Sequence, residues 1–159
     1  MKKLRIVLFK GNSFIAKLIH WQTRSEYTHV GIVIYDSDYP GEHKLYEAYH
    51  IGGVRSDRNY YTLLDETEAY IIPGLVGDTV DMVESFLKSK VGLKYDFLSV
   101  ARFVSRREAP RNDRYFCSEL VVDALSSAQV YILRGPAAKF SPRDISISPM
   151  LIRARPGLE

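Results

Sequence analysis

The chain has 159 residues, a formal net charge of +3 and one cysteine. Its length suits one domain with a sizeable core, and 46% apolar with 26% charged residues is ordinary for a globular protein. One cysteine excludes an intramolecular disulfide framework and a zinc site built on several cysteines. So mild a positive charge does not indicate nucleic acid. We therefore expect a single domain, 1–159, with no nucleic-acid partner.

No segment predicts export or membrane insertion. Arg5 and Lys10 leave only four apolar residues between them, too few for the apolar region of a signal peptide. No stretch approaches the ~18 apolar residues of a membrane span. We expect a soluble protein in the cytoplasm of a bacterium or of a phage-infected cell.

The first half of the chain predicts one helix among strands. Residues 4–9 are strand-like, and Asn12 or Ser13 can cap a helix over 14–21. Residues 28–35 are rich in β-branched side chains, and alternation places Val30, Ile32 and Ile34 on the face opposite His29 and its alternating neighbours. A polar turn separates this strand from a second over 43–50, which predicts an antiparallel hairpin.

The second half predicts mostly helices. After Gly52-Gly53 come a short strand at 54–56 and another at 68–72; helices follow over 78–90, 96–104 and 117–127. Asp78 is the expected N-cap of the first of these helices and Gly92 its end. Ser141-Pro142-Arg143-Asp144 predicts a further helix start, and the tail after Pro149 is expected to be peripheral. The pattern indicates an α+β fold with a small antiparallel sheet packed against helices.

The lone cysteine, Cys117, begins a predicted helix. Apolar residues recur behind it on one helical face, at Leu120, Val121, Ala124 and Leu125. A thiol in the first turn faces unpaired backbone N–H groups and the positive end of the helix dipole, and both favour the thiolate. The alternative is an inert, buried cysteine that packs as a small hydrophobe.

Thiol catalysis requires a base, and the chain has four histidines. His29 begins the most apolar strand, and Gly31 on its face is expected to leave space beside it. His20 follows an apolar helix, His43 lies next to an acidic turn and is expected to be exposed, and His50 ends its strand. His29 is therefore the candidate base; the alternative is a structural histidine without a catalytic role.

Glu47 interrupts the apolar and aromatic run L-Y-E-A-Y on the next strand. A carboxylate there is costly to bury without a partner, and a histidine on the adjacent strand is suitable. Glu47 would then orient His29 and stabilise its imidazolium form. A half-exposed glutamate on an edge strand is the alternative, and Asp36 is a second candidate for the orienting group.

A basic segment precedes the cysteine helix. It holds five arginines against Glu108 and Asp113. It predicts either a solvated loop or a basic rim that binds an anionic substrate or surface weakly. The arginines are Arg102, Arg106, Arg107, Arg111 and Arg114.

In order, Y-T-H-V-G-I-V-I, Y-E-A, K-Y-D-F and F-C-S-E-L-V resemble the motifs of the circularly permuted NlpC-type, papain-like cysteine amidases, which include the YiiX/YaeF-like proteins. The similarity spans about residues 5–148. It implies a permuted papain-like fold, with the cysteine helix packed against a small antiparallel sheet or barrel, in which histidine precedes cysteine along the chain. It also implies Cys117 as nucleophile, His29 as base, Glu47 as third polar group, and Tyr95 near the oxyanion or the substrate.

These observations predict a cysteine hydrolase that acts by acyl transfer on an amide bond, with cell-wall peptide material as one substrate class. Alternatives are a lipid- or thioester-directed acyltransferase or deacylase, and a non-catalytic binding module. An apolar membrane anchor is not evident in the sequence. We expect no cofactor and no metal, because His29, Glu47 and His50 lack the close spacing of a metal motif.

Overall fold

The structure is a computed structural model that describes residues 1–39, 43–57, 67–99 and 113–154. Its centre is a six-stranded antiparallel sheet with the order β4-β3-β2-β1-β5-β8. The strands are β1 (Lys2–Phe9), β2 (His29–Asp36), β3 (His43–Tyr49), β4 (Gly53–Asp57), β5 (Thr67–Ile71) and β8 (Ile152–Arg153). The predicted α+β class is confirmed.

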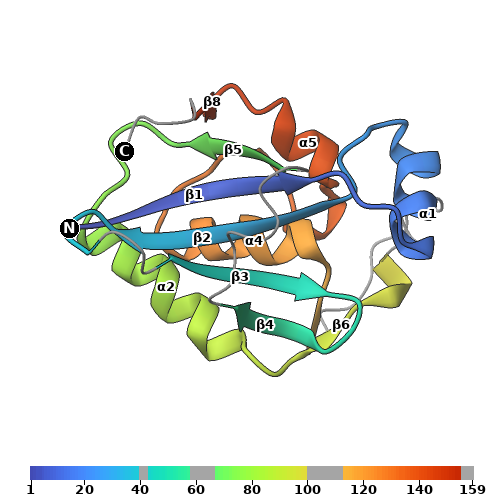
Figure 1. Cartoon of the computed structure of the whole chain (residues 1–159), viewed down its shortest axis with the longest axis horizontal. Coiled ribbons are helices and arrows are strands. Elements are labelled where there is room, and N and C mark those ends of the chain that lie inside the picture. Colours follow the sequence, from blue (N-terminus) through green and yellow to red (C-terminus); the bar gives the residue numbers. More distant parts are fainter. Residues whose placement is uncertain (40–42, 58–66, 100–112, 155–159) are drawn as a thin grey trace.

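Two long helices pack against the sheet, and a third lies beyond its end. α2 (Asp78–Lys90) and α4 (Cys117–Ser127) contact each other, and α4 packs against β2 and β3. α1 (Phe14–Thr23) lies at the right-hand end in Figure 1, away from the N-terminus. The remaining elements are β6 (Lys94–Tyr95), β7 (Arg114–Tyr115), a 3₁₀ turn (Ala137–Lys139) and α5 (Pro142–Ser146).

The alternation predicted for β2 places its side chains on two faces. Val30, Ile32 and Ile34 belong to the main core, together with residues of α2 and α4. Val33 and Tyr35 belong to a smaller cluster on the opposite face of the sheet. His29 shares the parity of this second set, because successive strand residues point to opposite faces.

Local signals located most helix ends. Ser13 caps α1 by accepting from the backbone N–H of Ala16, and Ser141 caps α5 with Asp144 in a reciprocal capping box. The expected cap at Asp78 is wrong: Gly77 is the N-cap, without a side-chain bond, and Asp78 lies in the first turn of α2. An acid in the first turn still stabilises the helix through the macrodipole.

One more expectation is wrong, and two others are made more precise. His43 is buried rather than exposed, because its ring stacks on Tyr35 at 5.3 Å. The tail after Pro149 contributes β8, which adds an edge strand to the sheet through Tyr70↔Arg153 and Ile71↔Ile152. The helix expected over 96–104 is helical at 97–99, and the rest lies outside the described residues. Within the described residues, every helix is too short or too polar to span a bilayer.

Candidate active site

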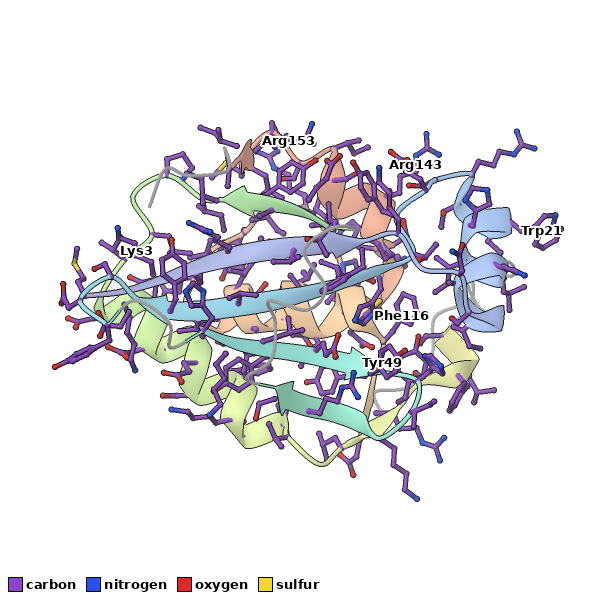
Figure 2. All side chains as sticks on the ribbon, viewed as in Figure 1. Lys3, Trp21, Tyr49, Phe116, Arg143 and Arg153 are labelled. Atoms are coloured by element: carbon purple, nitrogen blue, oxygen red, sulfur yellow. The ribbon has the colours of Figure 1, made fainter. Side chains whose placement is uncertain are left out.

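His29 and Cys117 meet at one end of the sheet because each is the first residue of its element. His29 begins β2, and Cys117 begins α4, which packs against that strand. The Cys117 side chain interacts with the His29 imidazole and raises its pKa. Figure 2 shows this end of the molecule, marked by Tyr49 and Phe116.

Glu47 binds the other side of the imidazole. His29 Nε2 lies 2.6 Å from Glu47 Oε2, which leaves Nδ1 for the thiol. Two aromatic rings flank the imidazole: Phe9 at 5.2 Å and Tyr49 edge-on at 5.7 Å. The ring of His29 is thus held in one orientation between a sulfur and a carboxylate.

These partners determine the charge of His29. Burial lowers its pKa, but the interactions with Cys117 and then with Glu47 outweigh burial and raise the pKa from 6.5 to about 9. The imidazole therefore carries a proton at neutral pH. An imidazolium bound to a thiol on one side and a carboxylate on the other can give a proton to a leaving group.

Arg55 on β4 completes the group. Its Nε and Nη2 donate to Glu47 Oε1 at 2.9 and 2.7 Å, while Oε2 of the same carboxylate faces His29. The guanidinium also lies over the ring of Tyr49, 4.2 Å from its centroid. Burial raises the pKa of Glu47, and His29 and Arg55 together lower it below its usual value. Glu47 is therefore an anion although it is only 3% exposed.

Gly31 has a different role from the one expected. A Cβ there would lie 2.8 Å from Leu45 Cδ1 and 2.9 Å from the Tyr46 carbonyl oxygen, so the position is filled rather than open. The same Cβ would be 3.4 Å from the Cβ of Glu47. Glycine thus allows β2 and β3 to approach closely where His29 reaches Glu47.

Cys117 is buried and rigidly placed. It has no exposed surface and belongs to the main core. The next residue, Ser118, is also fully buried and donates from Oγ to the Phe140 carbonyl. At the helix start, the Phe116 backbone N–H donates to Glu119. The thiol therefore has the buried environment of a structural cysteine and, at the same time, an imidazole partner.

Tyr95 lies beside the thiol. β6 pairs in parallel with β7, so that Tyr95 is opposite Tyr115, two residues before Cys117. Its ring is 5.9 Å from that of Phe116. Burial, and then the proximity of Cys117 and Asp96, raise the pKa of Tyr95 well above its usual value. Its hydroxyl is therefore a hydrogen-bond donor at any ordinary pH.

The other candidates lie apart or outside the description. Asp36 ends β2, far along the strand from His29, and binds the N-terminal amine at 2.6 Å. Burial, and then the charges of His29 and Arg55, lower the pKa of His50 below its usual value. Arg114 is exposed on β7; Arg102, Arg106, Arg107 and Arg111 lie outside the described residues.

Sequence reasoning missed Arg55 and Tyr49. Arg55 lies in a short strand after a double glycine. The contact follows from the register of β3 and β4, which pairs Arg55 with Glu47. Alternation with the buried Val54 was the one available signal, because it places Arg55 on the face of the sheet opposite the main core.

Comparison with known proteins identifies a fold. No family model matches the sequence, and no curated protein sequence matches it. A solved structure, the metalloprotein yiiX from Escherichia coli O157:H7, is similar over 96% of both chains, with a TM-score of 0.73 and 17% sequence identity. The chain has the yiiX fold, as its motif order indicated.

Proposed function

We propose that this chain is a cysteine hydrolase of permuted papain-like fold that acts by acyl transfer on an amide bond. Cys117 is the nucleophile, His29 the general acid and base, and Glu47 the group that orients His29. One observation carries the proposal: the His29 imidazole is bonded to Glu47 through Nε2 and also interacts with the Cys117 side chain. A histidine with only a structural role would not need to lie beside a thiol.

In the proposed reaction Cys117 acts as a thiolate, with its proton already held by the His29 imidazolium. The thiolate attacks the carbonyl carbon, and the carbonyl oxygen becomes an oxyanion. Backbone N–H groups in the first turn of α4, together with the Tyr95 hydroxyl, would donate hydrogen bonds to that charge. His29 protonates the leaving amine, the C–N bond breaks, and a thioester with Cys117 remains. Water activated by His29 then hydrolyses the thioester and restores the thiol.

Burial of Cys117 adds a requirement. Because the residue is 0% exposed, a carbonyl can reach Sγ only when neighbouring side chains move. Small reagents should therefore label the thiol faster than bulky ones of equal intrinsic reactivity. Such opening motions are common where enzymes exclude water from the reaction.

The substrate class rests on the motif resemblance. Cell-wall peptide material is the leading class, and a thioester or an acyl lipid would need the same nucleophile, base and oxyanion donors. The chemistry of the three side chains is common to all of these. A non-catalytic module would not require Cys117, His29 and Glu47 to be in contact.

The similarity to a metalloprotein raises the question of a metal. In the described part of the chain, no group of three or more His, Cys, Asp or Glu side chains could hold a metal ion. Glu47, which such a site would need, is already bonded to His29 through one oxygen and to Arg55 through the other. The side chains in the described ranges do not fit a metal, and no step of the proposed reaction uses one.

Alkylation by a small thiol reagent at neutral pH tests the proposal. Cys117 is the only thiol, so mass spectrometry reports this residue alone. We expect labelling faster than that of a free peptide thiol, and much slower labelling in His29→Ala. If both proteins label no faster than the peptide, the proposal fails. Peptidoglycan fragments, thioesters and acyl lipids then form the substrate screen.

A further inference from the structure

The outer face of α1 combines cations with an aromatic side chain. Lys17, His20, Trp21 and Arg24 are all exposed and spaced three and four residues apart, which places them on one side of the helix. The opposite side, with Ala16 and Ile19, is buried. α1 contains no Asp or Glu. The exposed face is therefore positively charged around one large aromatic ring.

Trp21 is the least expected residue on this surface. Its side chain is 70% exposed, and Figure 2 shows it directed away from the body of the molecule at the right-hand end. Tryptophan in a monomer is normally well buried. Exposed tryptophan beside Lys and Arg is typical of helices that lie in a membrane interface, where the ring enters the headgroup region.

Further apolar side chains lie at the same end of the sheet. Phe97 and Leu98 are 50% and 56% exposed. The helical turn at 97–99 is drawn in yellow at the right of Figure 1, below α1, and Tyr95 of the candidate site packs on Phe97 at 5.0 Å. This end of the molecule thus presents apolar groups both on α1 and beside the site.

A basic hollow lies between α1 and the start of β2. It encloses about 490 Å³, and Lys10, Lys17 and His20 line it. The acid in its wall, Glu26, binds Lys10 at 3.0 Å, which offsets its charge. Thr28, the residue before His29, forms part of the same wall. The hollow thus offers positive charge close to the candidate site.

We propose that the face formed by Lys17, Trp21 and Arg24 docks on an anionic phospholipid bilayer, with Trp21 in the headgroup region and the cations on lipid phosphates. Charge complementarity selects the occupant: a second copy of the chain would bring like charges together, whereas an anionic surface attracts each of them. Docking in this way turns the end of the sheet that holds His29 and Cys117 toward the lipid. It does not depend on catalysis.

Trp21 is the only tryptophan, so its fluorescence reports this face directly. Vesicles of phosphatidylcholine with phosphatidylglycerol should shift its emission to the blue, and the full chain should sediment with them. Pure phosphatidylcholine vesicles should do neither, and high salt should weaken the effect. The absence of a shift and of co-sedimentation with anionic vesicles would overturn the proposal.

Matched variants separate docking from general charge or hydrophobicity. Trp21→Ala should weaken partitioning, measured by sedimentation, at least about tenfold, whereas Tyr39→Ala should not. Tyr39 is also 66% exposed, and it follows Asp36, at the end of β2 opposite His29. Lys17→Glu should weaken it about tenfold, and Lys3→Glu, at the left of Figure 2, much less. Equal losses in variant and control contradict the proposal.

Two further measurements keep the inference distinct. Cys117→Ala should bind vesicles as the natural chain does. A failure of the proposed hydrolase therefore leaves docking intact, and a failure of docking leaves the proposed hydrolase intact. Analytical ultracentrifugation without lipid tests the rival occupant. A dimer that Trp21→Ala dissociates would assign the face to a second copy and overturn lipid docking.

Discussion

Two buried carboxylates lie on opposite faces of the sheet, and only one of them is bonded to a histidine. Glu47 on β3 and Glu84 on α2 are 3% and 7% exposed, and each is bound by cations. Tyr46, the residue before Glu47 on β3, connects the two groups, because its hydroxyl donates to Glu84 at 3.1 Å. Burial of a charge is therefore not the distinguishing feature.

The partners differ. Glu84 is bound by Lys2 at 2.7 Å and Lys88 at 2.9 Å; burial raises its pKa, but these bonds lower the pKa to about 2. Lysines keep their protons throughout the physiological range, so this group is permanently ionised. Glu47 binds an imidazole that can release its proton and that also touches a thiol. A carboxylate becomes useful for acyl transfer when its partner titrates beside a nucleophile.

The sharpest test of this difference removes the proposed nucleophile. Cys117→Ala should abolish thiol labelling and lower hydrolysis of any accepted substrate at least about 10³-fold. The smaller side chain keeps the helix start apolar, so far-UV circular dichroism should be unchanged. Activity that survives in Cys117→Ala would mean that the chemistry lies elsewhere.

The two carboxylates can be compared directly with one substitution each. Glu47→Gln should lower kcat/KM about 100-fold, because His29 loses the anion that orients it. Glu84→Gln should leave kcat/KM within about twofold and lower the free energy of unfolding by roughly 1–2 kcal/mol, because Lys2 and Lys88 lose their counter-charge. Activity assays with thermal melts separate the outcomes. Equal losses of activity would remove the distinction.

A pH profile tests the charge of His29. Its folded pKa of about 9 exceeds the ordinary 6.5. The proton therefore stabilises the folded state fully below about pH 6.5, and this contribution is lost as the pH rises through about 9. The proposed activity should fall above about pH 9, and in Glu47→Gln the fall should begin at lower pH. An unmoved alkaline limb would show that Glu47 does not act on His29.

Arg55 should have a smaller effect, because it acts through Glu47. Arg55→Ala should lower kcat about fivefold, with KM little changed. Arg55→Lys should restore only part of the lost kcat, because lysine brings back the positive charge but cannot supply the two parallel bonds. Arg153→Ala is the matched control. It removes another arginine–glutamate pair, Arg153 with Glu68 at 2.9 Å, that does not touch His29.

Tyr95 is expected to contribute least. Tyr95→Phe removes one hydroxyl donor and leaves the backbone donors of α4 in place, so kcat should fall about threefold to tenfold. Tyr70→Phe is a control at a hydroxyl bound to Glu68 instead. If Tyr95→Phe matches this control, Tyr95 is only a packing residue.

Local patterns in the sequence were enough for most elements and for the candidate residues. The periodicity behind Cys117 defined α4 at 117–127, and β-branched alternation gave β2 with its two faces. His29, Glu47 and Cys117 stood out because each is chemically unusual within an apolar segment. These signals depend on neighbours in the chain, which a sequence displays directly.

Contacts between distant segments required the tertiary structure. The distance between Glu47 and His29, the clamp of Arg55 and the burial of His43 all depend on strand register. Likewise, tryptophan is a residue type that is usually buried, and Trp21 is exposed only because α1 packs through its other face. The sequence by itself determined which groups can react and which elements carry them. Packing decided which of those groups meet, because side-chain partners are set by long-range pairing and not by spacing along the chain.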